Sequence, residues 1–248
     1  PREEMERITA MLKRVLPKVA DYAVVDIELQ KLNSSFPEAL KKSILQEAVQ
    51  GKLVPQDPSD EPAEALLERI RAEKQRLIKE GKIKKNKHES VIFRRDNSHY
   101  EKRGLEVVCI DDEIPFDIPE LWSWCRLNEL CTKIGAGSTP TGGKTIYVPE
   151  GIKFIRSQNV YNDGLKLNDI SYITEEINAK KKGSIVRSKD ILLNITGGSI
   201  GRCAVVPDDF DIANVNQHVM IIRLVEPKMR HWIHTILISE YIQNLIMD

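Results

Sequence analysis

The sequence lacks the features that mark a membrane protein, a fibre or a small disulfide-stabilised scaffold. No stretch approaches the roughly 18 uninterrupted apolar residues that a membrane-spanning helix needs, and no basic-then-apolar signal segment opens the chain. The four cysteines form no CxxC pair and no framework spacing, so a reducing cytoplasm is the expected location. Charge of one sign is also lacking, because 37 basic and 37 acidic side chains cancel. A hydrophobic share of 41% is ordinary for a protein that buries a core, which excludes a disordered tail.

The length of 248 residues permits one or two domains. The sequence opens at Pro1 without a methionine and stops at Asp248 in an apolar, helix-like run. We therefore expect it to be a piece of a longer protein.

Apolar residues in the N-terminal part recur at alternating steps of three and four, which is the period of a coiled-coil seam. The seam consists of Met5, Ile8, Leu12, Val15, Val19, Tyr22, Leu29, Phe36 and Leu40. Pro17 and Pro37 each remove a backbone donor and should kink or interrupt the helix. Because the register continues across Pro37, a kinked, collinear rod that ends near Gly51 is favoured.

A second repeat predicts another helix. Ala63, Ile70 and Leu77 recur every seven residues and indicate a helix to about Gly81, which should pack on the first helix or on a partner. The basic run that follows, at positions 82–87, is typical of a solvated helix exit and linker, with a nucleic-acid contact as the alternative.

From about residue 111 the pattern changes to short apolar runs between turn residues, which predict strands. The runs are IKFIRS (152–157), SYIT (171–174), SIVR (184–187), DILLNIT (190–196), CAVVP (203–207) and VMIIRLV (219–225). Residues 229–248 again have a helical pattern. The expected fold is α+β, with long coiled-coil-like helices over 1–88, a linker over 89–113 and a mixed α/β domain over 114–248.

Motifs for catalysis, nucleotides and metals are absent or incomplete. GAGSTPTGGKT (135–145) is close to a phosphate-binding loop, but the first glycine of that motif would fall on Ser138, and strand-like residues follow instead of a helix. His231 and His234 lie three apart, yet no nearby carboxylate or cysteine completes a metal site. No GxSxG elbow frames a nucleophile. The sequence therefore predicts no catalytic residue, no metal and no cofactor in this chain, and ATP or GTP binding through Lys144 is the alternative.

Three polar segments lie between the expected strands: SQNVYNDG (157–164), TGGSIGR (196–202) and NVNQH (214–218). Asparagine and glutamine can read adenine edges and arginine can read guanine, whereas lysine, serine and threonine hold phosphates. Basic residues also outnumber acidic ones between 151 and 207, which suits a polyanion. Glycine and asparagine populate any tight turn, however, so ordinary loops are the alternative.

Longer blocks of sequence carry a resemblance. LKKSILQEAVQGKLVPQDPSDEPAEALLERIRAEKQRLIKEGKIKK (40–85) is followed by IPFDIPELWSWCRLNELCTKIGAGSTP (114–140) and then by FIRSQNV, DILLNITGGSIGRCAVVP and NVNQHVMIIRL. In this order they resemble the specificity subunit of type I restriction–modification enzymes. The first block resembles its central conserved region, and the others resemble the opening and interior of its target recognition domain.

This resemblance implies a non-enzymatic subunit that reads double-stranded DNA. A complete member has two target recognition domains, each reading one half of a split target, and two helical regions that pair as an antiparallel coiled coil. Its partners are adenine methyltransferase subunits, which bind S-adenosylmethionine, and motor–nuclease subunits. This chain matches one helical region and one target recognition domain without its final segment. We therefore expect a fragment, or a half-subunit that self-associates through its helices.

The loop chemistry and the resemblance together select candidate contacts to DNA bases or phosphates. They are Ser138, Thr139, Thr141 and Lys144 in the first loop, Arg156, Gln158, Asn159 and Tyr161 in the second, and Thr196, Ser199 and Arg202 in the third. Asn216, Gln217 and His218 are assigned a structural role as the alternative to DNA contact. The competing function is a coiled-coil scaffold or assembly protein without DNA readout.

Overall fold

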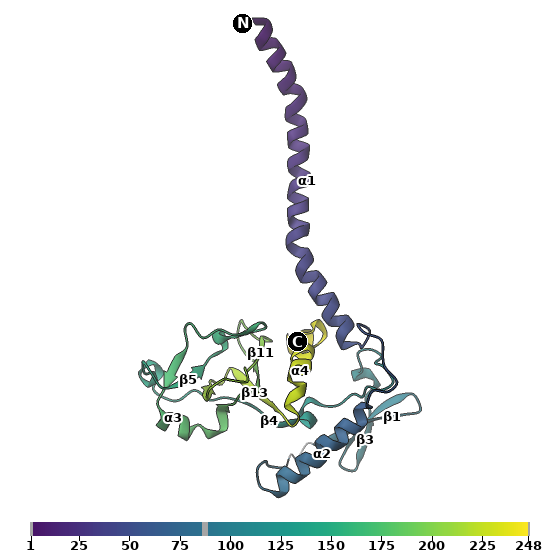
Figure 1. Cartoon of the computed structure of the whole chain (residues 1–248), viewed down its shortest axis with the longest axis vertical. Helices are drawn as coiled ribbons and strands as arrows, with labels where there is room; N and C mark the ends of the chain where they lie inside the picture. Colours follow the sequence, from purple (N-terminus) through teal and green to yellow (C-terminus); the bar gives the residue numbers. More distant parts are fainter. Residues whose placement is uncertain (1, 86–88, 248) are drawn as a thin grey trace. The chain divides into compact units, whose positions relative to one another are not determined.

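The structure is a computed structural model that describes residues 2–85 and 89–247, apart from the side chain of Lys144. The chain divides into two compact units, residues 1–44 and 45–248, which are described separately below (Figure 1). None of the described helices has the length and apolar content required to cross a membrane. Within the same residues, no group of three or more histidine, cysteine or acidic side chains is placed to hold a metal ion.

The first unit consists of helix α1 (Arg2–Val49), whose last residues extend into the second unit. The helix continues across Pro17 and Pro37, which confirms the favoured collinear rod over two separate helices. Neither proline interrupts it, because the fixed φ of proline is itself helical and only single backbone bonds are lost. Gly51, with φ of +71°, ends the helix as predicted. All nine seam residues are exposed, from 36% at Val15 to 72% at Tyr22. The helix therefore presents an apolar seam without a partner in its own unit.

Helix α2 (Ala63–Lys79) belongs to the second unit. Its buried residues Leu67 and Ile70 pack with Ile191 and Ile222 of the C-terminal sheet. This corrects the expectation that α2 packs on the first helix or on a partner. The heptad pattern identified the apolar face of α2 but not the element that it packs against. That element is the C-terminal sheet, whose apolar surface α2 covers.

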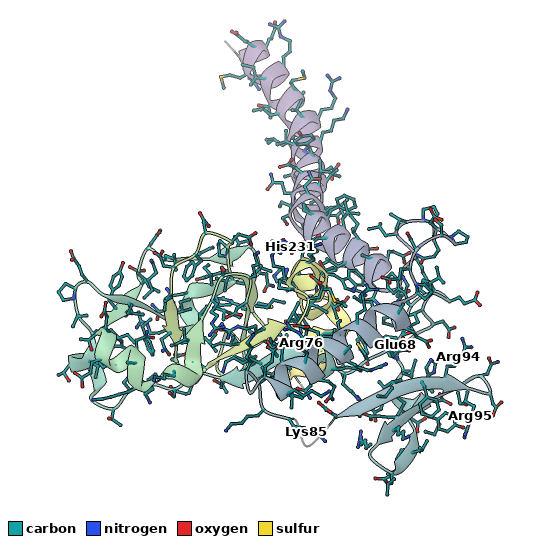
Figure 2. All side chains as sticks on the ribbon, turned by 60° about the horizontal axis from the view of Figure 1, so that its bottom comes forward. Glu68, Arg76, Lys85, Arg94, Arg95 and His231 are labelled. Carbon is teal, nitrogen blue, oxygen red and sulfur yellow. The ribbon has the colours of Figure 1, made fainter. Side chains whose placement is uncertain are left out.

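A three-stranded antiparallel sheet replaces the linker that was expected over 89–113. Its strands are β1 (Ser90–Arg95), β2 (Ser98–Arg103) and β3 (Glu106–Cys109). Asp96 and Asn97, both with positive φ, make the two-residue turn between β1 and β2, beside Arg94 and Arg95 (Figure 2). The sequence did not predict these strands because charged pairs interrupt the apolar alternation. The boundaries of the predicted functional domains, 1–88 and 114–248, stay predictions.

Two four-stranded sheets form the rest of the domain. The first has the order β11-β10-β13-β4, and its strands are β4 (Cys131–Ala136), β10 (Ile191–Asn194), β11 (Cys203–Val205) and β13 (Val219–Leu224). The second has the order β8-β5-β12-β9, and its strands are β5 (Ile152–Ile155), β8 (Ser171–Ile173), β9 (Ile185–Val186) and β12 (Ala213–Val215). Each of the six predicted apolar runs contains one of these strands, which confirms those predictions. Strands β4 and β12 were not predicted.

The first sheet lies between helices and the second sheet (Figure 1). Successive residues of a strand point to opposite faces. Accordingly, Ile191 and Ile222 pack with α2 and with helix α4 (Arg230–Leu237), whereas Leu192 and Ile221 pack with Ile155 of the second sheet. The mixed helix-and-sheet class predicted from the sequence is confirmed.

Smaller elements complete the domain. The hairpin β6 (Val160–Tyr161) and β7 (Gly164–Leu165) follows β5, and the short helix α3 (Glu175–Lys180) precedes β9. The predicted C-terminal helix is two helices, α4 and α5 (Glu240–Met247). Residues 238 and 239 separate them, and the Ser239 hydroxyl donates back to the carbonyl of Ile236.

A candidate nucleic-acid interface

Strand register brings four loops to one edge of the two sheets. The last residues of β4 and β10, Ala136 and Asn194, pair with the start of β13, and the last residues of β5 and β12, Ile155 and Val215, pair with each other. The loops that leave these strand ends are loop A (137–145), loop B (156–164), loop C (195–202) and loop D (216–218). We call them together the loop edge.

Main-chain hydrogen bonds join the two sheets at this edge. The Gly137 N–H donates to the carbonyl of Val219 (3.0 Å), and the Ser138 N–H donates to that of Val215 (3.2 Å). A Cβ added to Gly137 would lie 2.1 Å from the Val215 carbonyl oxygen, so this close approach requires glycine. Loop A is thereby fixed against both sheets.

A chain of side chains crosses three of the loops. The Thr139 hydroxyl of loop A donates to Gln217 Oε1 of loop D. The Gln217 amide lies 3.1 Å from His218 Nε2, and His218 Nδ1 bonds the Thr196 hydroxyl of loop C. Asn216 is buried, and its Oδ1 accepts from the His218 N–H. These contacts favour the structural role for residues 216–218 over DNA contact.

Asn159 is buried in loop B, and both ends of its amide are bound to main chain. Its Nδ2 donates to the Lys166 carbonyl (2.9 Å), and its Oδ1 accepts from the Arg156 N–H (3.0 Å). The side chain is therefore occupied in holding the loop, and we remove it from the candidates for base contact. The Arg156 guanidinium donates to the Asp169 carbonyl at 3.3 Å and lies 5.9 Å from the Tyr147 ring centroid.

Tyr161 and Arg202 meet between loops B and C. The Arg202 guanidinium lies 4.5 Å from the Tyr161 ring centroid, and the Lys166 ammonium lies 4.0 Å from it. Both distances are within the range of cation–π attraction, so the ring supports two cations. Arg202 makes no side-chain hydrogen bond or ion pair with the residues that the structure describes, so its N–H donors remain available.

The other candidate side chains differ in whether they already make hydrogen bonds within the protein. Gln158 and Thr141 are exposed and make no side-chain hydrogen bond with any described residue, whereas the Ser199 hydroxyl accepts from Asn194. Lys144 lies in a short 3₁₀ turn (Gly143–Ile146), and its side chain lies outside the description. This turn, followed by a β-bridge at Val148, is not the helix that a phosphate-binding loop requires.

The basic surplus seen in the sequence is partly neutralised. Ion pairs join Lys153 to Asp211 (2.7 Å) and Lys180 to Glu176 (2.6 Å). By contrast, Arg187, Lys189 and Arg202 form no ion pair within the described part of the chain. The charge available to a polyanion is therefore smaller than composition suggested, and Arg202 brings part of it to the loop edge.

Two asparagines that were not singled out in the sequence fix loop B to the first sheet. Asn194 ends β10, and its Nδ2 donates to the Ser157 carbonyl of loop B (2.8 Å) and to the Ser199 hydroxyl of loop C (3.0 Å). Asn162 Oδ1 accepts from the Cys203 N–H (2.9 Å). A polar residue inside the apolar run DILLNIT was the available signal for Asn194, because buried amides are kept where they make hydrogen bonds.

No family model matches this chain. It is 35% identical over 158 residues to the type I restriction enzyme EcoAI specificity subunit of Escherichia coli, covering 64% of this chain and 23% of that protein. The curated homologues of this chain are type I restriction enzyme specificity subunits.

Two further relatives carry the same description in Escherichia coli. The EcoEI specificity subunit is 46% identical over 103 residues (42% of this chain, 14% of that protein), and the EcoBI subunit is 26% identical over 196 residues (74% and 40%). The chain thus spans less than half the length of each curated relative that it matches.

Solved structures align more weakly. The HsdS subunit from Thermoanaerobacter tengcongensis aligns with a TM-score of 0.40 and 16% identity, over 74% of this chain and 39% of that one. A chain from a study of complex assembly and conformational transition of the type I R-M system aligns with a TM-score of 0.38 and 18% identity, over 50% and 28%.

Proposed function

We propose that the chain provides sequence-specific DNA recognition in a type I restriction–modification system and reads one half of a bipartite target. The observation that carries this proposal is the loop edge, where four polar loops from two sheets are tied together. Interlinked loops present their free side chains in a fixed arrangement, which readout of base edges requires. The specificity-subunit homologues support the same role.

The loop edge supplies chemistry for both kinds of DNA contact. Arg202, with uncommitted N–H donors, suits the O6 and N7 acceptors of guanine, and the exposed amide of Gln158 suits the N6 and N7 groups of adenine. The exposed hydroxyl of Thr141 and the ammonium of Lys144 suit phosphates, which set position without reading sequence.

In this proposal residues 1–88 serve assembly and residues 114–248 form the target recognition domain. The exposed seam of α1 provides the apolar surface for a coiled-coil partner, either a second helical region or a second copy of the chain. The helical region also docks the adenine methyltransferase subunit, which binds S-adenosylmethionine. The chain itself is non-catalytic, and motor–nuclease subunits join the complete complex.

Base-reading variants test the proposal. In complex with the cognate methyltransferase subunit, Gln158→Ala and Arg202→Ala should each relax the methylated sequence at one position, by about 1–3 kcal/mol of discrimination per lost bidentate contact. Lys180→Ala, on α3 and paired with Glu176, is the matched surface control and should leave the methylation pattern unchanged. An unchanged pattern in both loop variants would remove these two residues from the reading surface.

A phosphate-contact variant tests the other half of the chemistry. Lys144→Ala should weaken binding to all duplexes alike and reduce the salt slope of the affinity by about one unit. A change in sequence preference instead would reassign Lys144 to base readout.

The scaffold alternative keeps one observation in its favour, namely the long exposed seam of α1. A scaffold needs that seam but has no use for an interlinked loop edge. Salt-dependent, sequence-selective binding to duplex DNA separates the two functions, since a scaffold lacks it.

A further inference from the structure

We propose that Asn194 is a positioning residue that holds loops B and C of the reading surface in register with each other. This inference rests on the proposed function, because it concerns how that surface is built. Asn194 is fully buried (0% exposed) and makes no contact with solvent, so it reads no base itself. It acts through the residues that it holds.

Four hydrogen bonds converge on this residue. Its Nδ2 donates to the Ser157 carbonyl of loop B and to the Ser199 hydroxyl of loop C, at 2.8 and 3.0 Å. Its own N–H donates to the Arg202 carbonyl (2.8 Å), and its carbonyl accepts from the Gly201 N–H (2.9 Å). Loops B and C, which are about forty positions apart in the sequence, are therefore fixed to one side chain.

The two proposed base readers are adjacent to these bonds. Gln158 follows Ser157 directly, and Arg202 is bonded to Asn194 through its own carbonyl. The cation–π contact of Arg202 with Tyr161 again joins loop C to loop B. A shift of one loop past the other would separate the two readers from the base edges that they contact together.

Only one orientation of the Asn194 side-chain amide places a donor opposite the Ser157 carbonyl. A carbonyl oxygen only accepts, so the nitrogen of the Asn194 amide, and not its oxygen, must face Ser157. The Oδ1 atom is then buried and has no hydrogen-bond partner among the described residues. A buried acceptor without a partner is unfavourable, and an apolar side chain, like those of Leu192 and Leu193 in the same strand, would avoid it. The donors to loops B and C account for an amide at this position.

This arrangement separates sequence discrimination from general affinity. The proposed phosphate contacts of loop A are held by Gly137, Ser138 and Thr139 through bonds that do not involve Asn194. Loss of the Asn194 donors should thus disturb base readout and leave phosphate binding intact. A residue needed only for folding would affect both together.

The test compares Asn194→Leu with Asn214→Leu in the complex of this chain with its cognate methyltransferase subunit. Asn214 is also fully buried in a strand, and its Nδ2 also donates twice, but to Asn178 of α3 and to the Lys181 carbonyl. It therefore matches Asn194 in burial and in its two donated bonds without touching loops B and C, and its Oδ1 additionally accepts from the Val215 N–H. The measured quantities are the affinity ratio between the selected target duplex and random duplex, the salt slope, and thermal unfolding.

Asn194→Leu should reduce the affinity ratio about tenfold or more, the size of one lost bidentate base contact, with random-duplex affinity and salt slope within about twofold of wild type. Asn214→Leu should keep this affinity ratio within about twofold of wild type, even if its unfolding temperature falls as much as that of Asn194→Leu. If Asn194→Leu does not fold, Asn194→Ser carries the same expectation, because serine is too short to bond both loops.

An unchanged ratio in the Asn194 variant, or equal loss in both variants, would overturn the inference and leave the proposed function standing. A wild-type complex that selects no target sequence would overturn both. Hydrogen exchange adds a readout without DNA: the amides of 157–159 and 199–202 should exchange faster in Asn194→Leu than in Asn214→Leu.

Discussion

Asp190 is almost completely buried, and both of its carboxylate oxygens are bound. Arg223 donates to Oδ1 and Oδ2 at 2.7 Å each, and the Arg187 N–H donates to Oδ2 at 2.8 Å. This bidentate pair joins the segment before β10 to the end of β13, at the opposite end of these strands from the loop edge. Breaking a buried pair is costly because it leaves the other charge without a partner.

We predict that Asp190→Ala lowers the free energy of unfolding by about 3–5 kcal/mol, because Arg223 loses its partner. Urea denaturation measures the difference. The exposed pair Glu176–Lys180 provides the control, and Glu176→Gln should leave the free energy of unfolding close to that of wild type, because exposed ion pairs contribute little. Equal effects of the two substitutions would contradict the assignment of Asp190 as a buried anchor.

Glu101 links stability to pH. Arg126 donates to both carboxylate oxygens, and this bonding, with a further bond from Arg103, lowers the pKa of buried Glu101 to about 2 from its usual 4.5. A pKa depressed in the folded state stabilises the fold above the unfolded-state value, and this contribution is lost as pH falls toward the folded-state pKa.

Glu101→Gln should therefore reduce the free energy of unfolding by about 2–3 kcal/mol at neutral pH, and the difference from wild type should shrink between about pH 5 and pH 2. Denaturation curves at several pH values measure it. A difference that stays constant down to pH 2 would show that the ionised carboxylate is not what stabilises this contact.

Single residues also show the limit of sequence-based prediction of the site. The sequence located the polar loops, and the structure brings them to one edge. It did not distinguish Gln158, whose amide is exposed, from Asn159, whose amide is bound to main chain. Both are amides in one loop, and only the hydrogen bonds across the fold decide which one is free.

Among the elements, the strands with continuous apolar runs were predicted and the short polar ones were not. Strands β10 and β13 are covered by layers on both sides, so their sequences are apolar runs interrupted only by Asn194 and Arg223. Strands β1–β3 carry Arg94, Arg95, Lys102 and Arg103 and have little apolar alternation. Helix α2 was predicted as a helix, but its heptad repeat did not reveal that its neighbour is the C-terminal sheet.

The docking of α2 gives a prediction at the scale of the element. Ile70→Ala should lower the free energy of unfolding by about 2–5 kcal/mol, because Ile70 is buried against Ile191 and Ile222. Leu12→Ala on α1 is the control, since Leu12 is exposed and should change the free energy by less than about 1 kcal/mol. Denaturation of the isolated chain measures both, and equal effects would contradict the packing of α2.

The close approach of loop A gives a second prediction. Gly137→Ala would place its Cβ against the carbonyl oxygens of Val215 and Asn216, so backbone must shift, and we expect a loss of about 1–3 kcal/mol in unfolding free energy. Gly183→Ala, where no atom lies within 4 Å of the added Cβ, should be close to neutral. Thermal unfolding of both variants measures the contrast. A neutral Gly137 variant would mean that loop A is not held against β12.

In the whole molecule, a helical unit and a mixed helix-and-sheet unit carry different surfaces, one suited to helix pairing and one to ligand contact. Residues 1–44 expose an apolar seam that suits pairing, whereas residues 45–248 contain the loop edge. The chain spans less than half the length of each of these curated relatives. In the proposed function, the other half of a bipartite target is read by a second reading domain from another segment or another copy.

DNA readout by the loop edge is tested by selecting duplexes from a random pool with this chain, co-purified with its cognate methyltransferase subunit. We expect an enriched consensus that contains an adenine for the methyltransferase, with affinity that falls steeply as salt rises. Co-purification without any consensus would contradict DNA readout by the loop edge and leave the helical region as a docking scaffold.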